Sequence, residues 1–183
     1  MCIRDRLEAV AHLKEDLPWE LEIVGPSDFP EYRKKLDKIA AAHNIQKRVH
    51  WTGYASFGKP LFDRMRAADI FVLPTLSEGT PHVLVEARAS GLPCISTTVG
   101  GVPTTVSDGV DALLVSPKDS RALARAMKRI IHDGELRRAL IRNGLVSARQ
   151  QTFGHFINTV LNELEVDLEG AAAPVAEQYG RRA

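Results

Sequence analysis

The sequence contains no uninterrupted apolar run near the roughly 20 residues that a membrane-spanning helix needs. Its start, MCIRDRLEAV, carries charges where a secretory signal peptide needs an apolar segment. We therefore expect a cytoplasmic, soluble protein without a transmembrane segment.

The sequence also lacks a dominant charge and a cysteine framework. Its 24 Lys and Arg residues offset 23 Asp and Glu residues, which gives a formal net charge of +1. This balance argues against nucleic acid as an electrostatic partner. Two cysteines, Cys2 and Cys94, are too few for a disulfide framework, and Cys94 is expected to be a small buried hydrophobe. No Cys/His cluster has metal-ligand spacing, so no metal site is expected.

The residues that are present alternate between helical and strand patterns. Apolar spacing and Gly, Pro and Asn punctuation predict helices over 7–14, 31–44, 60–68, 81–90, 120–133, 134–151 and 153–168, and strands over 19–25, 48–53, 69–74, 93–98 and 112–117. Short loops between alternating elements are typical of a parallel sheet covered on both faces. The predicted fold is therefore α/β, with a doubly wound, Rossmann-like parallel sheet and additional C-terminal helices.

The expected organisation is one domain with extensions. We expect a leader over 1–6, a Rossmann-like domain over 7–151, a C-terminal helix over 152–168 and a disordered tail over 169–183, where the sequence is EGAAAPVAEQYGRRA. Ligands of such sheets bind outside the carboxyl ends of the strands, so the loops after Val24, Thr52, Leu73 and Thr97 are the candidate site. A generic NAD-binding domain is disfavoured, because VGPSDF stands where G-x-G-x-x-G would follow the first strand.

The stretch SEGTPHVLVEA, residues 77–87, contains two glutamates at the start of a predicted helix. Thr80 suits the N-cap position and Pro81 the first helical position. The amides from Gly79 to Val83 could hold a phosphate or sugar hydroxyls at the helix N-terminus. Glu86 lies one turn beyond His82, and helical side chains lean toward the N-terminus, so Glu78 and Glu86 can face one pocket and accept hydrogen bonds from a diol. From this spacing alone, the alternative is a Glu78 that favours the helix dipole and a solvated or Arg-paired Glu86.

Three segments resemble the C-terminal, nucleotide-sugar-binding domain of retaining glycosyltransferases of the GT-B fold, in particular family 4. They are LEIVGPS (21–27), RVHWTGY (48–54) and the long segment over 68–119 that holds E-x7-E, A-x-G-x-P and the two-glycine loop Gly100-Gly101. The resemblance covers roughly Leu7 to Gln151. It implies the fold predicted above and transfer of a sugar from a nucleotide-diphosphate donor, such as a UDP- or GDP-sugar, with retention and without a metal.

The resemblance also implies a role for each matching residue. Glu78 would contact hydroxyls of the donor sugar, and Glu86 the ribose diol. The amides around Gly79 and Thr80 would approach sugar and phosphate, and His82 would be a polar residue at the pocket edge. Tyr54 would line the base pocket, and Gly25 would let the backbone come close to the donor.

The sequence departs from the family pattern in three places. The acceptor-binding N-terminal domain is absent, and so is the first strand of this domain with the basic G-R…K-G segment that neutralises the donor pyrophosphate. Thr104 stands where the family commonly has Glu. We therefore expect a donor-binding domain that needs an N-terminal acceptor domain or partner chain and is inactive alone.

Two alternatives to this interpretation remain. The first is a non-catalytic, nucleotide-sugar-binding subunit of a two-chain transferase. The weaker one is another nucleotide-sugar enzyme on the same fold, such as an epimerase or a phosphorylase.

Overall fold

A computed structural model describes residues 3–13, 18–25 and 29–151. The chain divides into two compact units, Met1–Ala148 and Arg149–Ala183. All described strands belong to the first unit. The predicted helix over 153–168 and the predicted tail over 169–183 lie outside the described residues, as does Cys2.

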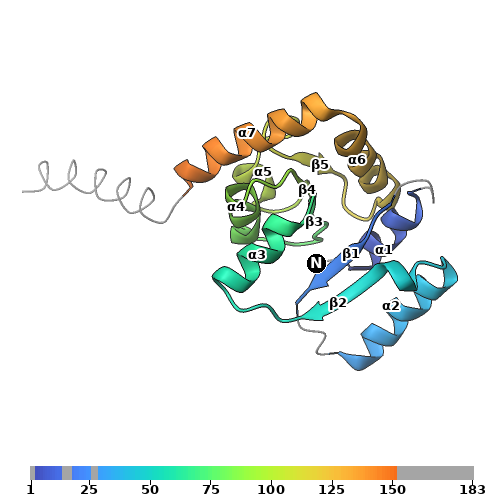
Figure 1. Cartoon of the computed structure of the whole chain (residues 1–183). Helices are drawn as coiled ribbons and strands as arrows, with labels where there is room; N and C mark the ends of the chain where they lie inside the picture. The colour runs from blue at the N-terminus through green and yellow to red at the C-terminus, as the bar shows by residue number, and fades with distance from the viewer. Residues whose placement is uncertain (1–2, 14–17, 26–28, 152–183) are drawn as a thin grey trace, which may run out of the picture. The chain divides into compact units, whose positions relative to one another are not determined.

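Helices and strands alternate along the described chain, as the sequence predicts (Figure 1). The elements are α1 (Ile3–Ala11), β1 (Leu21–Val24), α2 (Pro30–Ala42), the 3-10 helix η1 (Gln46–Arg48), β2 (Val49–Gly53), α3 (Lys59–Ala67), β3 (Phe71–Leu73), α4 (His82–Ala89), β4 (Cys94–Thr97), α5 (Val102–Thr105), β5 (Leu113–Val115), α6 (Ser120–His132) and α7 (Gly134–Gln150). None of the helices in the described ranges is both long enough and apolar enough to span a membrane.

All strand pairs are parallel, which confirms the α/β class. The described strands form two sheets, one with the order β1-β2 and one with the order β3-β4-β5. Leu21 pairs with Val49 in the first sheet, and Phe71 pairs with Cys94 in the second. Among the described residues, β1 and β3 therefore each have a hydrogen-bonded strand on one side only.

Two hydrophobic clusters lie on the elements of the first unit. The larger cluster joins both sheets to α1, α2 and α6, through residues that include Leu7, Ile23, Leu36, Ile95, Leu113 and Leu123. The smaller cluster joins the three-stranded sheet to α3, α4 and α5, through residues that include Met65, Leu73, Leu84, Cys94 and Val102. The three-stranded sheet thus packs against two groups of helices through two separate hydrophobic clusters, as expected for a doubly wound fold.

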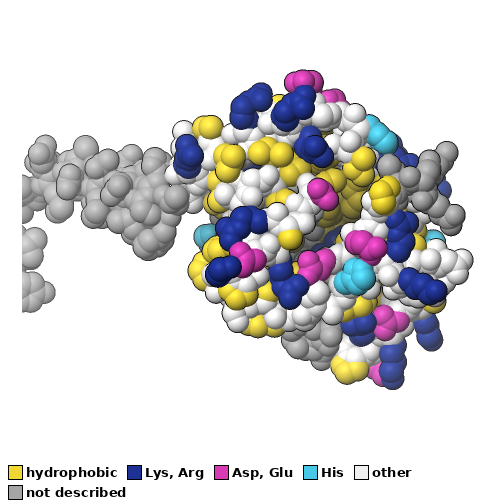
Figure 2. Space-filling view, in the orientation of Figure 1, with side chains coloured by type: hydrophobic (Ala, Val, Ile, Leu, Met, Phe, Trp, Pro, Cys, Tyr) yellow, Lys and Arg dark blue, Asp and Glu magenta, His cyan; other side chains and the backbone are white. Residues whose placement is uncertain are grey.

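The strand β3 is less buried than its sequence predicts. The apolar run 69–74 is typical of a strand that is buried on both faces. Leu73 is buried, but Phe71 and Val72 are only half-buried. Figure 2 shows a hollow with hydrophobic side chains at its wall on the face where Figure 1 has β1 and β3 next to each other. The unpaired edge of β3 explains the difference, because no neighbouring strand covers it in the described part of the chain.

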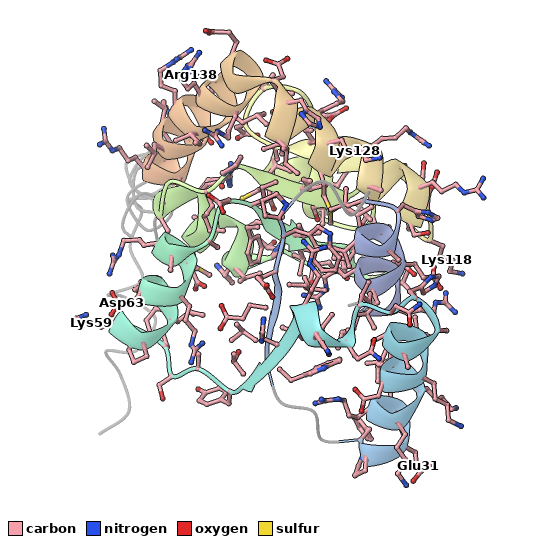
Figure 3. All side chains as sticks on the ribbon, turned by 45° about the vertical axis from the view of Figure 1, so that its right-hand side comes forward. Glu31, Lys59, Asp63, Lys118, Lys128 and Arg138 are labelled. Carbon is pink, nitrogen blue, oxygen red and sulfur yellow. The ribbon has the colours of Figure 1, made fainter. Side chains whose placement is uncertain are left out.

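Helix boundaries differ locally from the predicted ones. The helix predicted from Leu7 begins at Ile3, and the loop after Gly101 contains the four-residue helix α5, which was not predicted. The prediction of Asn44 at the end of α2 is confirmed, because Asn44 has a φ of 57° in the left-handed region. Exposed ion pairs line several helices, as with Lys59 and Asp63 on α3 in Figure 3.

Candidate functional site

The loop between β3 and α4 carries Glu78, and hydroxyl groups at the strand ends hold its path. Thr97 Oγ1 donates a hydrogen bond to the carbonyl oxygen of Thr75 over 2.7 Å. Thr75 Oγ1 in turn donates to the carbonyl oxygen of Ser77 over 2.9 Å. Both threonines are buried, and the bond from Thr97 to Thr75 forms away from water. The backbone directly before Glu78 is thereby tied to the ends of β3 and β4.

The two-glycine loop packs directly against the backbone at Glu78. The Gly101 amide donates a hydrogen bond to the carbonyl oxygen of Glu78 over 3.1 Å. A Cβ atom on Gly100 would lie 1.9 Å from that oxygen, and one on Gly101 would lie 2.3 Å from the carbonyl oxygen of Gly79. Only glycine fits at such distances, so the GG loop and the Glu78 loop form one main-chain unit.

Glu78 and Glu86 share a similar environment. Both residues are half-buried. Within the described residues, neither carboxylate takes part in the side-chain hydrogen bonds or ion pairs of the structure. The alternative of an Arg-paired Glu86 therefore has no support. A half-buried carboxylate without a protein partner keeps its acceptor positions available for a ligand.

The start of α4 differs from the predicted cap. Pro81, not Thr80, is the N-cap residue, and no side chain caps the helix. A proline carbonyl still accepts the first intrahelical bond, from the Leu84 amide at 2.9 Å. Gly79, Thr80 and His82 are exposed at this end, and Val83 is half-buried. Amide groups at the helix N-terminus therefore have no side-chain competitor for an anion.

The C-terminal end of α4 is followed by a glycine, directly after the predicted helix over 81–90. Gly91 has a φ of 80°, which is the left-handed conformation expected after the last helical turn. The helix thus runs from Glu78's loop to a glycine stop, with Glu86 in its second half.

Two further candidate residues lie at the end of the two-stranded sheet. Gly25 follows β1 with a φ of 140°, and its amide donates to the carbonyl oxygen of Gly53 over 2.8 Å. Tyr54 follows Gly53 and is 74% exposed. This bond brings Gly25 close to the residue that precedes Tyr54. Within the described residues, no hydrogen bond or ion pair given for the structure joins this pair to the Glu78 loop.

Arg88 is fully buried on α4 and was not among the residues predicted to form the site. Its Nη1 atom donates to Asp111 Oδ2 over 2.6 Å and to Ser147 Oγ over 2.8 Å. Its Nη2 atom donates to the carbonyl oxygen of Thr105 over 3.1 Å. From the sequence alone, an arginine two positions after Glu86 is expected to lie on the exposed surface of the helix. Its only sequence signal is the helical spacing, which places it on the face of the buried Leu84.

The parallel α/β fold and the two glutamates beside the two-glycine loop are the features expected of a glycosyltransferase domain, and comparison with known proteins agrees with this class. Residues 3–146 match the family model described as glycosyl transferases group 1. The chain belongs to this family. It is 31% identical over 138 residues to the lipopolysaccharide core biosynthesis glycosyltransferase LpsE of Rhizobium meliloti (strain 1021), a match that covers 75% of this chain and 38% of LpsE.

Solved structures share the fold. The chain is similar to Anabaena Alr3699/HepE in complex with UDP-glucose, with a TM-score of 0.78 and 24% identity, over 91% of this chain and 45% of HepE. It is also similar to the C-terminal domain of the glycosyl transferase group 1 family protein LpcC from Francisella tularensis, with a TM-score of 0.72 and 25% identity, over 80% of this chain and 77% of that domain. The chain therefore has the fold of the C-terminal half of a GT-B glycosyltransferase, and it spans less than half of LpsE and HepE.

Proposed function

We propose that this chain is the donor-binding domain of a retaining glycosyltransferase that uses a nucleotide-diphosphate sugar. The observation that carries the proposal is the pair of half-buried glutamates, which have no side-chain partner among the described residues and lie on the loop and helix beside the two-glycine loop. Family membership and the UDP-glucose bound by HepE support it.

In the proposed complex, Glu78 accepts hydrogen bonds from the donor sugar and Glu86 from the ribose diol. The amides at Gly79 and Thr80, with His82 and Val83 beside them, approach the sugar and the phosphates at the helix N-terminus. Tyr54 contacts the base, and Gly25 leaves room for the donor beside the backbone. The donor is a UDP- or GDP-sugar, and transfer needs no metal ion.

The acceptor site belongs to a region outside this chain, either an N-terminal domain or a partner chain. The 38% coverage of LpsE supports this division. Isolated, the chain is expected to bind donor and to transfer no sugar, because charge stabilisation of the leaving nucleotide, usually a large catalytic contribution, would be incomplete.

Isothermal titration with UDP and GDP tests the proposal. Glu86→Ala is expected to raise the Kd about tenfold or more, because a hydrogen bond to a charged group contributes about 1.5–3 kcal/mol. The control Glu31→Ala alters an exposed glutamate on α2 that pairs with Lys34, and should leave the Kd unchanged. Absence of binding to both nucleotides, or an equal loss in both variants, would contradict the proposal. Sugar transfer by the chain alone would contradict its dependence on a second region, and loss of binding with EDTA would contradict metal independence.

A further inference from the structure

A continuous set of contacts joins the backbone at Glu78 to the helix that carries Glu86. The carbonyl oxygen of Glu78 accepts from the Gly101 amide at 3.1 Å. The carbonyl oxygen of Gly101 accepts from Thr105 Oγ1 at 2.9 Å. The carbonyl oxygen of Thr105 accepts from Arg88 Nη2 at 3.1 Å, and Arg88 lies two residues after Glu86 on α4. With the intervening chain, these bonds close a ring through both glutamates.

The members of this ring have little freedom to move. Arg88 is fully buried and Thr105 is 5% exposed, so the hydrogen bond between them forms out of water, where breaking it is costly. The Arg88 guanidinium is also held from its other side by Asp111, whose Oδ1 accepts from the Ser107 amide at 2.7 Å. The ring is thereby anchored to the segment that follows α5.

Close approach of the two loops adds a steric constraint to the hydrogen bonds. Gly100 and Gly101 lie so near the backbone of Glu78 and Gly79 that even a Cβ atom has no room. Movement of α5 therefore moves the Glu78 loop with it, because densely packed groups transmit a displacement.

We propose that Thr105 and Arg88 are positioning residues that set the distance between Glu78 and Glu86 for one donor molecule. The inference rests on the proposed function, since it takes Glu86 as the nucleotide contact and Glu78 as the sugar contact. A donor that spans both groups binds well only when their separation matches its own length, and small misplacements of binding groups are costly. A change in the ring should then weaken the contribution of the sugar more than that of the nucleotide.

The ratio of the Kd for UDP to the Kd for UDP-glucose measures the contribution of the sugar. If GDP binds the wild type more tightly than UDP, the ratio is measured with GDP and GDP-mannose in place of UDP and UDP-glucose. Thr105→Val removes the hydroxyl donor and keeps the branched shape. Because Thr104 Oγ1 also donates to the Gly101 carbonyl, at 2.8 Å, the double variant Thr104→Val with Thr105→Val removes both hydroxyl bonds.

The expected result is a graded loss. The double variant should lower the Kd ratio about tenfold and Thr105→Val by a smaller factor, with less than a twofold change in the Kd for UDP. Thr105→Ser keeps the hydroxyl and should restore the wild-type ratio. Arg88→Lys keeps the positive charge near Asp111 and should lower the ratio as the double variant does. Arg48→Lys is a matched control for Arg88→Lys and should leave the ratio unchanged, because Arg48 Nε also donates to a backbone carbonyl, that of Trp19, but outside the ring.

Three outcomes would overturn the inference. One is an unchanged ratio in the double variant. Another is a loss for UDP equal to the loss for UDP-glucose, which indicates general destabilisation. The third is a wild type that binds UDP-glucose no more tightly than UDP, which removes the role of Glu78. A wild type that binds no nucleotide contradicts the proposed function itself and is thereby distinguished from these results.

Discussion

At the scale of single residues, burial determines the reactivity of the Cys94 thiol. It lies on β4 with no exposed surface, as the sequence predicts for a small hydrophobe. Burial raises the pKa of the Cys94 thiol from 9.0 to about 12, with a smaller opposing effect of Arg88, because a thiolate loses its hydration in the interior. The neutral thiol is a poor nucleophile, so this cysteine is a packing residue.

The first prediction concerns this thiol. In a Cys2→Ser variant, Cys94 should not react with a disulfide reagent such as DTNB at pH 8 in the folded protein, and should react fully in guanidinium chloride. Because the folded pKa lies above the unfolded one, the stability associated with Cys94 is complete below pH 9 and declines as the pH rises toward 12. The urea midpoint should therefore fall less on raising the pH to 10.5 in Cys94→Ala than in the parent. Rapid labelling of the folded protein would contradict the assignment.

At the scale of elements, the order of helices and strands could be predicted because each leaves a local signal. The run IFVL before α4 and the glycine stop at Gly91 mark a strand and a helix end without any knowledge of the neighbours. The position of Pro81 as the N-cap was not predictable, since Thr80 has the better capping side chain. The helix α5 was missed because four residues carry too little periodicity.

The part of the candidate site that lies in one continuous segment could also be predicted, because its signals are local. Glu78, Glu86 and the two glycines stand in one continuous segment, so their order is visible in the sequence. Arg88 depends on partners that are far away along the chain, since Asp111 is 23 residues and Ser147 is 59 residues distant. Long-range contacts of this kind override the local preference of arginine for the surface.

The second prediction concerns the contact between the two loops. Gly100→Ala should reduce the free energy of unfolding by about 2–4 kcal/mol, because it adds a clash to the strain of a left-handed backbone. The matched control is Gly109→Ala, where φ is also positive but no atom lies within 4 Å of the new Cβ. This control should lose only about 1–2 kcal/mol, the cost of the backbone conformation alone. Equal losses in urea denaturation would show that the close approach is unimportant.

At the scale of the molecule, the described strands fall into two sheets that share one hydrophobic cluster. Ile23 of the two-stranded sheet and Ile95 of the three-stranded sheet both belong to the larger cluster. In the structure, β1 and β3 each end a sheet, and Phe71 and Val72 remain half-buried there. Sequence patterns identify strands one at a time and do not show which edges remain unpaired.

The third prediction concerns the open edge of β3. The Phe71 amide donates toward the β4 side, to the carbonyl oxygen of Pro93 at 3.0 Å. Main-chain groups of successive strand residues point to opposite sides, so the Val72 amide points away from β4. Hydrogen exchange monitored by NMR should therefore be fast at Val72 and slow at Ile95, which lies between two strands. Equal protection of both amides would show that the edge is covered.

The strand edges that have no partner among the described residues also have a consequence for handling the protein in solution. An exposed strand edge is a template for hydrogen bonding with another chain, and the hydrophobic side chains around it strengthen such association. Neither β1 nor β3 contains a proline or a lysine, which are residues that commonly discourage pairing at an edge. Concentrated samples of this chain should therefore form aggregates with intermolecular strand pairing, and dilute, cold storage should delay their formation.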